Sequence, residues 1–495
     1  MTHSAAANRL SFASRSQNET PEAGSAIGPS WAARSLLLLL IAVTLLASSE
    51  ALAADLHPED AVVLARRFLE SSDSRERKAL AAQLASYRGA IDPVLTRLRA
   101  RTYNRVEAGF HPEKSFSVPA LREKHPDDLL YFNVPPDYSP KEPTGLIVFM
   151  HGGSNTSSRR APRLTLDFPP EGTPENESNQ LGNVFNATGL IAVGPSAPWD
   201  EESYYRWCLR ESDEYLADVI RECGSRFHID PDRVILVGHS MGGFGAYHHA
   251  QRQPDRFSSI VAHAGSWSLG YLPAMRGTPL CIIQGVNDAR EGVRWHYTDV
   301  EYARLTHKLL TGYQLEHTYY EHAGKHAVAE GKEHIAKYLA VAKNLRRDPY
   351  CSRVTIATPA GFRRNYCSAL ADNRWLSINE TLPGNLRYDE LVTNDADDFH
   401  AWRLSHQVSE RSGAMIDAVN RGHNQITLTT ANVAECTVWL HPRMVDVAKP
   451  INIVLNGKQV FANRVQPSLF VALESYERRH DWGLIYPIKI VLNCP

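Results

Sequence analysis

The chain has 495 residues, of which 43% are hydrophobic and 22% charged, so it is long enough for two or three domains with buried cores and too apolar to be disordered. Its formal net charge of −2 argues against a basic surface for nucleic acid or anionic lipid. A small neutral substrate fits this charge better.

The first 53 residues have the pattern of a leader. Arg34 precedes an apolar stretch at 36–47 of signal-peptide length, and residues 51–53 (Ala-Leu-Ala) match a cleavage pattern. We expect residues 1–53 to be removed on export, giving a secreted or periplasmic protein with no stable membrane span. A signal anchor is the alternative, which the short apolar core disfavours.

Residues 54–115 are predicted to form a small helical extension. Apolar residues recur at helical spacing over 62–69 and again over 80–98, in a background of Lys, Arg and Glu. The segment is too short for a propeller-sized domain, so we expect a cap or packing extension.

Residues 116–347 alternate strand-like and helix-like segments, which predicts an α/β domain with a doubly wound, mostly parallel sheet covered on both faces. The candidate strands are residues 146–150, 190–193, 234–237, 260–263, 280–284 and 315–320. Residues 215–227 and the segment after Ser240 have helical periodicity.

Residues 348–495 are predicted to form a separate β-rich module. Short β-like runs with turn signals occur at 353–358, 374–378, 425–430, 436–440, 451–455 and 485–492, with one helix near 469–478. Asn456-Gly457 is a strong hairpin signal. Carbohydrate or cell-wall contact and completion of the fold are the two roles we consider for this module. Cys436 with Cys494, and Cys351 with Cys367, are candidate disulfide pairs in an exported chain.

A serine stands where a buried strand is expected to meet a helix. Gly238-His239-Ser240-Met241-Gly242 follows the apolar run at 234–237 and matches Gly-x-Ser-x-Gly, in which a sharp strand-to-helix turn exposes the serine hydroxyl. Small residues after the serine let the helix lie close to the sheet. A structural glycine turn is the alternative interpretation.

A serine nucleophile needs a histidine to take its proton and an acid to orient that histidine. Asp288 follows the strand at 280–284, and His326 follows the next strand, so the order is serine, acid, histidine with each at a strand end. His322 is the rival base, but it is expected to belong still to the strand. We expect His239 to line the substrate pocket.

Two regions of the sequence are candidates for binding the reacting group. His151-Gly152-Gly153-Ser154 follows the strand at 146–150, and the backbone N–H groups of Gly153 and Met241 are the expected oxyanion donors, with Ser154 as the alternative to Gly153. Trp199 and Trp207 are candidates to stack on a sugar or an aromatic acyl group; ordinary packing is the alternative. No ligand spacing predicts a metal, and no cofactor is implied.

Together, "FMHGGS", "VILVGHSMGGFGAYHHA", "IIQGVND" and "HAGKHA" resemble the secreted α/β-hydrolase esterases grouped around polyhydroxybutyrate depolymerases, feruloyl esterases and prolyl-oligopeptidase-like predicted peptidases. The resemblance covers about residues 145–345. It implies the α/β-hydrolase fold, with Ser240 as nucleophile, Asp288 as orienting acid and His326 as base. Lys325 departs from the Gly-Gly-His turn that is more usual before the histidine.

These observations predict an exported serine hydrolase that cleaves small-molecule or polymeric carboxylic esters through an acyl-enzyme on Ser240. A prolyl-oligopeptidase-like peptidase would use the same residues on an amide, but nothing resembles its propeller. A non-catalytic binding protein on a hydrolase scaffold is the third hypothesis.

Overall fold

A computed structural model describes residues 56–153, 159–166, 181–198, 206–288, 296–359, 371–394 and 401–494. The chain divides into two units, Met1–Asp55 and Leu56–Pro495, and all the described residues belong to the second. The predicted signal sequence therefore lies outside the described residues. Within the described ranges, no helix combines the length and the apolar character needed to cross a bilayer.

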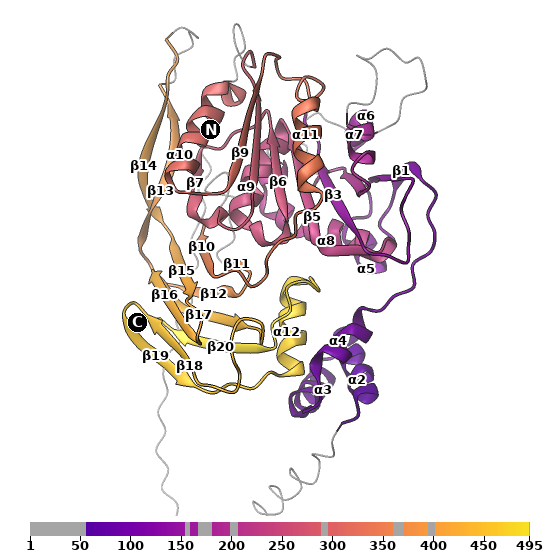
Figure 1. The fold of residues 1–495 in the computed structure, drawn as a ribbon, viewed down its shortest axis with the longest axis vertical. Helices are drawn as coiled ribbons and strands as arrows, with labels where there is room; N and C mark the ends of the chain where they lie inside the picture. Colours follow the sequence, from indigo (N-terminus) through magenta and orange to yellow (C-terminus); the bar gives the residue numbers. More distant parts are fainter. Residues whose placement is uncertain are drawn as a thin grey trace, which may run out of the picture. The chain divides into compact units, whose positions relative to one another are not determined.

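An eight-stranded sheet carries the candidate site (Figure 1). Its strands, in spatial order, are β1 (Gly109–Lys114), β2 (Leu130–Val134), β4 (Ile191–Pro195), β3 (Thr144–Met150), β5 (Ile229–His239), β6 (Ser259–His263), β8 (Leu280–Gly285) and β9 (His317–His322). The pairs β1–β2 and β2–β4 are antiparallel, and every other pair is parallel. The predicted mostly parallel α/β sheet is confirmed.

Helices cover both faces of this sheet. They are α6 (Ala161–Leu166), α7 (Gly182–Asn186), α8 (Arg210–Arg226), α9 (Met241–Arg252), α10 (Val300–Gly312) and α11 (Lys332–Ala342), with short 3₁₀ turns η2 (Arg206–Cys208), η3 (Pro254–Arg256), η4 (Leu272–Met275) and η5 (His296–Thr298). Along β5, Leu236 packs into the core on the α8–α9 side, whereas its neighbour Val237 packs into the core on the α11 side. Parallel strands covered on both faces need such unbroken apolar runs.

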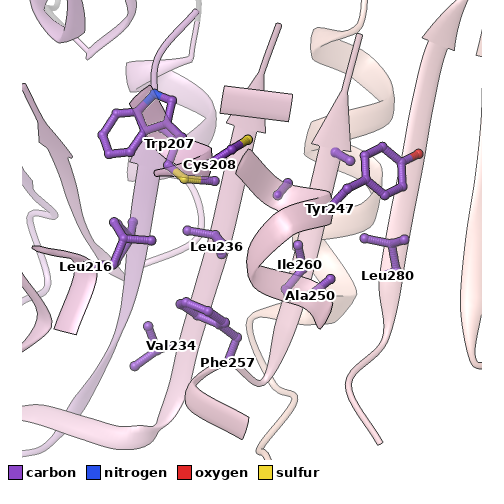
Figure 2. Close-up of a cluster of buried hydrophobic side chains, with 14 of the residues drawn as sticks. Trp207, Cys208, Leu216, Val234, Leu236, Tyr247, Ala250, Phe257, Ile260 and Leu280 are labelled. Carbon is purple, nitrogen blue, oxygen red and sulfur yellow. The ribbon is translucent and has the colours of Figure 1, made fainter. Parts of the chain in front are cut away.

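Figure 2 shows part of the core on the α9 side, where Val234, Leu236 and Ile260 of the sheet lie opposite Tyr247 and Ala250 of α9. All five side chains are almost completely buried. Burial of one such aliphatic side chain stabilises the fold by ~1.5–3 kcal/mol. This packing fixes α9, and with it the end of β5, against the sheet.

The N-terminal helices pack on the C-terminal part of the chain. The helices α2 (Pro58–Glu70), α3 (Ser74–Ser86) and α4 (Ile91–Arg99) share a core with α12 (Leu469–Arg479). The rings of Phe68 and Phe470 meet edge to face at 5.7 Å, and Arg77 donates to both carboxylate oxygens of Glu477 at 2.7 Å. After these helices, β1 joins the large sheet seven residues before the boundary that we predicted at residue 116, and the short helix α5 (Pro119–Lys124) follows.

Two sheets face each other across a shared core in residues 353–493. One contains β10 (Arg353–Thr358), β15 (Ala414–Asn420), β16 (Gln425–Ala431), β18 (Ile451–Leu455) and β19 (Lys458–Asn463); the other contains β11 (Ala371–Asn373), β12 (Leu376–Thr381), β17 (Val433–Leu440) and β20 (Ile488–Asn493). Asn456 and Gly457, with φ values of 48° and 83°, form the β18–β19 turn that we predicted. The thiols of Cys436 and Cys494 lie 3.5 Å apart without a disulfide; Cys367 lies outside the described residues.

A third, three-stranded sheet connects this module to the α/β domain. The long strands β13 (Asn385–Thr393) and β14 (Leu404–Ser412) pair with each other, and β13 also pairs with the short strand β7 (Leu269–Gly270), which follows β6. We call residues 385–394 and 401–412 the arm. The arm runs beside α10 (Figure 1).

Buried ion pairs also connect the two parts. The carboxylate of Asp255, on η3 of the α/β domain, is fully buried and accepts hydrogen bonds of 2.6 Å from the Arg479 side chain and from the Arg374 backbone N–H. Arg347 donates to both carboxylate oxygens of Asp481 at 2.6 and 2.7 Å. Separating the two parts would leave these buried charges without partners, so the ion pairs and the shared sheet stabilise the contact between them.

Candidate active site

Ser240 occupies a strained turn between β5 and α9. Its φ of 56° lies in the left-handed region that a side chain rarely adopts. The flanking glycines make this turn possible: a Cβ at Gly238 would lie 2.0 Å from the carbonyl oxygen of Gly242, and one at Gly242 would lie 2.0 Å from that of Met150. The Gly-x-Ser-x-Gly pattern is thus required by close backbone approach.

The structure brings Ser240, His326 and Asp288 into one hydrogen-bonded line. Nε2 of His326 lies 2.8 Å from Oγ of Ser240, and its Nδ1 lies 2.9 and 3.1 Å from the carboxylate oxygens of Asp288. With Nδ1–H donated to the carboxylate, Nε2 is left to accept the serine proton. The rival base, His322, sits at the end of β9 and stacks its ring on that of His263 instead.

Two side chains that the sequence did not reveal hold Asp288. Its carboxylate is 2% exposed and accepts hydrogen bonds from Nε2 of Gln284 (2.8 Å) and from Oγ1 of Thr298 (2.9 Å). Gln284 also donates to the carbonyl of Thr298 at 2.6 Å. A buried carboxylate needs such donors, and they fix the side that it presents to His326.

The loop after β3 lies directly beside the serine. A Cβ at Gly152 would lie 3.0 Å from the Cβ of Ser240, and Gly153 has a φ of 128°. Met241 is the first residue of α9, so its N–H has no acceptor within the helix. The two predicted donors, Gly153 and Met241, therefore lie on the two segments that flank Ser240. Ser154 lies outside the described residues.

Trp207 packs against the loop after β3. Its ring is fully buried, and its indole N–H donates to the carbonyl of His151 at 3.1 Å. The ring of His151 in turn has Nε2 3.2 Å from the carbonyl of Ser196. Trp207 thus offers no face for a substrate in this conformation and packs under the glycine loop. Trp199 lies outside the described residues.

His239 begins a row of histidines that leads away from His326. Its ring centroid is 5.2 Å from that of His326, and its Nδ1 is 2.8 Å from Nδ1 of His263, so one of these two rings donates and the other accepts. His263 stacks on His322 at 5.7 Å, and His322 meets His334 at 6.1 Å. His239 therefore packs beside the base, and its nitrogen faces His263.

This row predicts acid sensitivity. Burial, reinforced by His322, His326 and His334, lowers the pKa of His263 to about 3, and burial also holds the pKa of His239 well below its usual range. The unfolded chain takes up these protons from about pH 6.5 downward, while the folded chain stays neutral. The unfolding free energy is therefore expected to fall by ~1.4 kcal/mol per pH unit for each such histidine, and to be fully regained above about pH 6.5.

Urea titrations of the wild type and His263→Gln between about pH 5 and 7 measure this slope. The variant should lose about one histidine's share of the pH dependence, whereas His423→Asn, which changes an exposed histidine, should keep the wild-type slope. Equal slopes for wild type and His263→Gln would contradict the assignment of the buried neutral imidazole.

One group of potential metal ligands occurs among the described residues, at Asp213, His248 and His249. Nε of Arg252 donates to Asp213 at 2.8 Å, so a cation already faces this carboxylate. Burial opposes ionisation of Asp213, but the hydrogen bond from His248 and the charge of Arg252 lower its pKa to about 2. We interpret the group as a buried ion cluster between α8 and α9.

Comparisons with known proteins show similarity to esterases and to a peptidase. The family model described as "Putative esterase" matches residues 201–310. The chain is 23% identical over 162 residues to a bifunctional acetylxylan esterase/xylanase from Neocallimastix patriciarum, a match that covers 31% of this chain and 23% of that protein. It is 26% identical over 113 residues to dipeptidyl-peptidase 5 from Porphyromonas gingivalis, covering 20% of this chain and 16% of that protein.

The matches span less than a quarter of the length of either relative. Among solved structures, S-formylglutathione hydrolase from Staphylococcus aureus aligns with 16% identity and a TM-score of 0.35, covering 48% of this chain and 99% of that one. The sheet order and the turn at Ser240 are those of an α/β-hydrolase fold, and the family match over residues 201–310 supports an esterase-type protein.

Proposed function

We propose that the protein is a serine hydrolase that cleaves carboxylic esters through an acyl-enzyme on Ser240. The observation that carries this proposal is the continuous line from Oγ of Ser240 through His326 to Asp288, with contacts of 2.8 and 2.9 Å. A serine held in a strained turn and bonded to a histidine that a buried acid orients is the arrangement that acyl transfer needs.

In the first half-reaction, Oγ of Ser240 attacks the ester carbonyl carbon as Nε2 of His326 takes the hydroxyl proton. Asp288 stabilises the imidazolium that forms, and the N–H groups of Gly153 and Met241 donate to the oxyanion. The tetrahedral intermediate collapses when the C–O bond to the alcohol breaks, and His326 returns its proton to the leaving alkoxide. Ser240 is left acylated.

In the second half-reaction, His326 takes a proton from water as the water oxygen attacks the acyl carbon. Collapse of the second intermediate breaks the bond to Oγ of Ser240, which regains its proton from His326 and releases the carboxylic acid. The ring of His239 lies beside that of His326, and the low pKa that burial gives it keeps a second positive charge away from the imidazolium.

Export and a carbohydrate- or polymer-linked ester belong to the same proposal. The apolar segment at 36–47 and the Ala-Leu-Ala sequence at 51–53 support cleavage of a signal peptide. The partial likeness to an acetylxylan esterase/xylanase supports an ester on a polysaccharide as one substrate class. In this proposal the C-terminal module contacts the carbohydrate part of the substrate in addition to its structural role.

Turnover of p-nitrophenyl acetate against a Gly-Pro p-nitroanilide tests the proposal. We expect the wild type to prefer the ester and Ser240→Ala to lose ester turnover by roughly 10⁴-fold or more. Ser225→Ala, on α8, is the matched control and should retain activity.

Preferential cleavage of the amide would replace the esterase assignment with the peptidase alternative, which the partial likeness to dipeptidyl-peptidase 5 favours. A folded wild type without any turnover of either probe would favour a binding protein on a hydrolase scaffold.

A further inference from the structure

The arm of the C-terminal module packs against α10 near the first turn of this helix. Trp402, at the start of the returning half of the arm, is 6% exposed and belongs to the core of the α/β domain. Its ring centroid lies 6.1 Å from that of Tyr302, which stands in the first turn of α10 and is itself 2% exposed. Tyr302 in turn lies 6.3 Å from Tyr297 of η5. Three aromatic rings thus form a row from the arm to η5.

The same arm also contacts the C-terminal end of α10. Tyr313, which follows the last turn, donates its hydroxyl to the two carboxylate oxygens of Asp389 at 3.0 Å. Asp389 is 4% exposed and lies 2.8 Å from Nε2 of His406, so it is fixed within the arm. The adjacent β13–β7 pairing, where Asp389 faces Gly270, secures the arm to the α/β domain.

The N-terminal end of α10 follows η5, and η5 contacts Asp288. Thr298, the last residue of η5, donates to Oδ1 of Asp288 at 2.9 Å and accepts from Gln284 at 2.6 Å. Asp299 then caps α10 by accepting from the N–H of Glu301 at 2.9 Å. Because only these few residues separate Thr298 from Tyr302, a shift of the first turn moves Thr298 as well.

We propose that the arm positions the catalytic acid: Trp402, packed on Tyr302, holds η5 so that Thr298 orients Asp288 toward His326. This inference rests on the proposed function, and it makes Trp402 a positioning residue contributed by the accessory module. A displacement of about 0.5–1 Å would weaken the Thr298–Asp288 hydrogen bond, and misplacements of that size lower rates by up to roughly 100-fold.

The test measures kcat and KM for p-nitrophenyl acetate, with active sites counted by fluorophosphonate titration so that unfolded protein drops out. Trp402→Ala should lower kcat per active site by about 10- to 100-fold while KM changes by less than about twofold. The acidic limb of its kcat/KM profile should move to lower pH, because an ill-placed carboxylate makes protonation of His326 less favourable. Trp402→Phe, which keeps a ring on Tyr302, should restore most of kcat.

Thr298→Val removes the hydrogen bond from Thr298 to Asp288 without changing the arm. It should reproduce both the lower kcat and the shift of the acidic limb. The double variant, Trp402→Ala with Thr298→Val, should have a kcat only slightly below that of the less active single variant, since both substitutions interrupt the same series of contacts. Trp439→Phe is the matched control: this tryptophan is 4% exposed and donates to Ser377 within the module, far along the chain from α10. It should keep the wild-type profile.

The outcomes separate the two proposals. A wild type that is neither labelled nor active refutes the proposed function. An active wild type whose Trp402→Ala variant keeps kcat and the pH profile refutes the positioning role, as does an unchanged Thr298→Val variant if Trp402→Ala does not fold.

Discussion

Replacement of His326 by alanine is expected to lower kcat for an ester by roughly 10⁴- to 10⁶-fold, close to the effect of removing Ser240 itself. Without His326, no base stands 2.8 Å from the serine hydroxyl, and no acid stands ready for the leaving alkoxide. Asp288→Asn should cost less, roughly 10³- to 10⁴-fold, because the imidazole remains but loses the partner that fixes its tautomer.

Initial rates with p-nitrophenyl acetate, and circular dichroism to verify the fold, measure this effect. His322→Ala provides the matched control, since His322 lies only four residues earlier and its ring contacts His263 and His334. It should retain activity within about tenfold. Inactivation by His322→Ala together with survival of His326→Ala would exchange the two assignments.

Asp255→Ala is expected to lower the unfolding free energy by about 3–5 kcal/mol. The fully buried carboxylate faces Arg479 at 2.6 Å, and its removal would leave a buried guanidinium without its partner. Burial raises the pKa of Asp255, but the charges of Arg479 and Arg374 outweigh it and hold the pKa below the usual 3.8. A lowered pKa means that this stabilisation is present at neutral pH and is lost only as the pH falls below about 4.

Urea titration at neutral pH measures the loss. Glu76→Ala removes the exposed ion pair with Arg67 and should change stability far less, because solvent screens such a pair. A loss for Asp255→Ala no larger than that of Glu76→Ala would contradict the description of a buried interface held by these charges.

The sheet and the serine turn could be predicted from sequence because their signals are local. Residues 234–237, before Ser240, are all apolar, as a strand buried on both faces requires. Glycines stand at 238 and 242 because the backbone of the turn leaves no room there for a Cβ. The order of Ser240, Asp288 and His326 along the chain also followed from the strand ends. These features depend only on residues that are neighbours in the chain, so the sequence is enough to predict them.

Other features depend on contacts between distant segments and left no local signal. Gln284 and Thr298 are single polar residues whose importance appears only when both meet Asp288. The strand β14, Leu404–Ser412, is largely exposed and polar, so it lacks the apolar alternation that marks a half-buried strand. Trp207 was ambiguous because an aromatic residue suits a substrate pocket and a core equally well. The partners Asp255 and Arg479 are 224 residues apart in the chain.

Intact-mass analysis after reaction with a fluorophosphonate, followed by peptide mapping, is the sharpest test of Ser240 as the nucleophile, because such a reagent reports an activated serine without any assumption about the substrate. We expect one adduct per chain on Ser240, no adduct in Ser240→Ala, and much slower labelling of His326→Ala. A folded wild type that remains unlabelled, or an adduct on a different serine, would contradict this assignment.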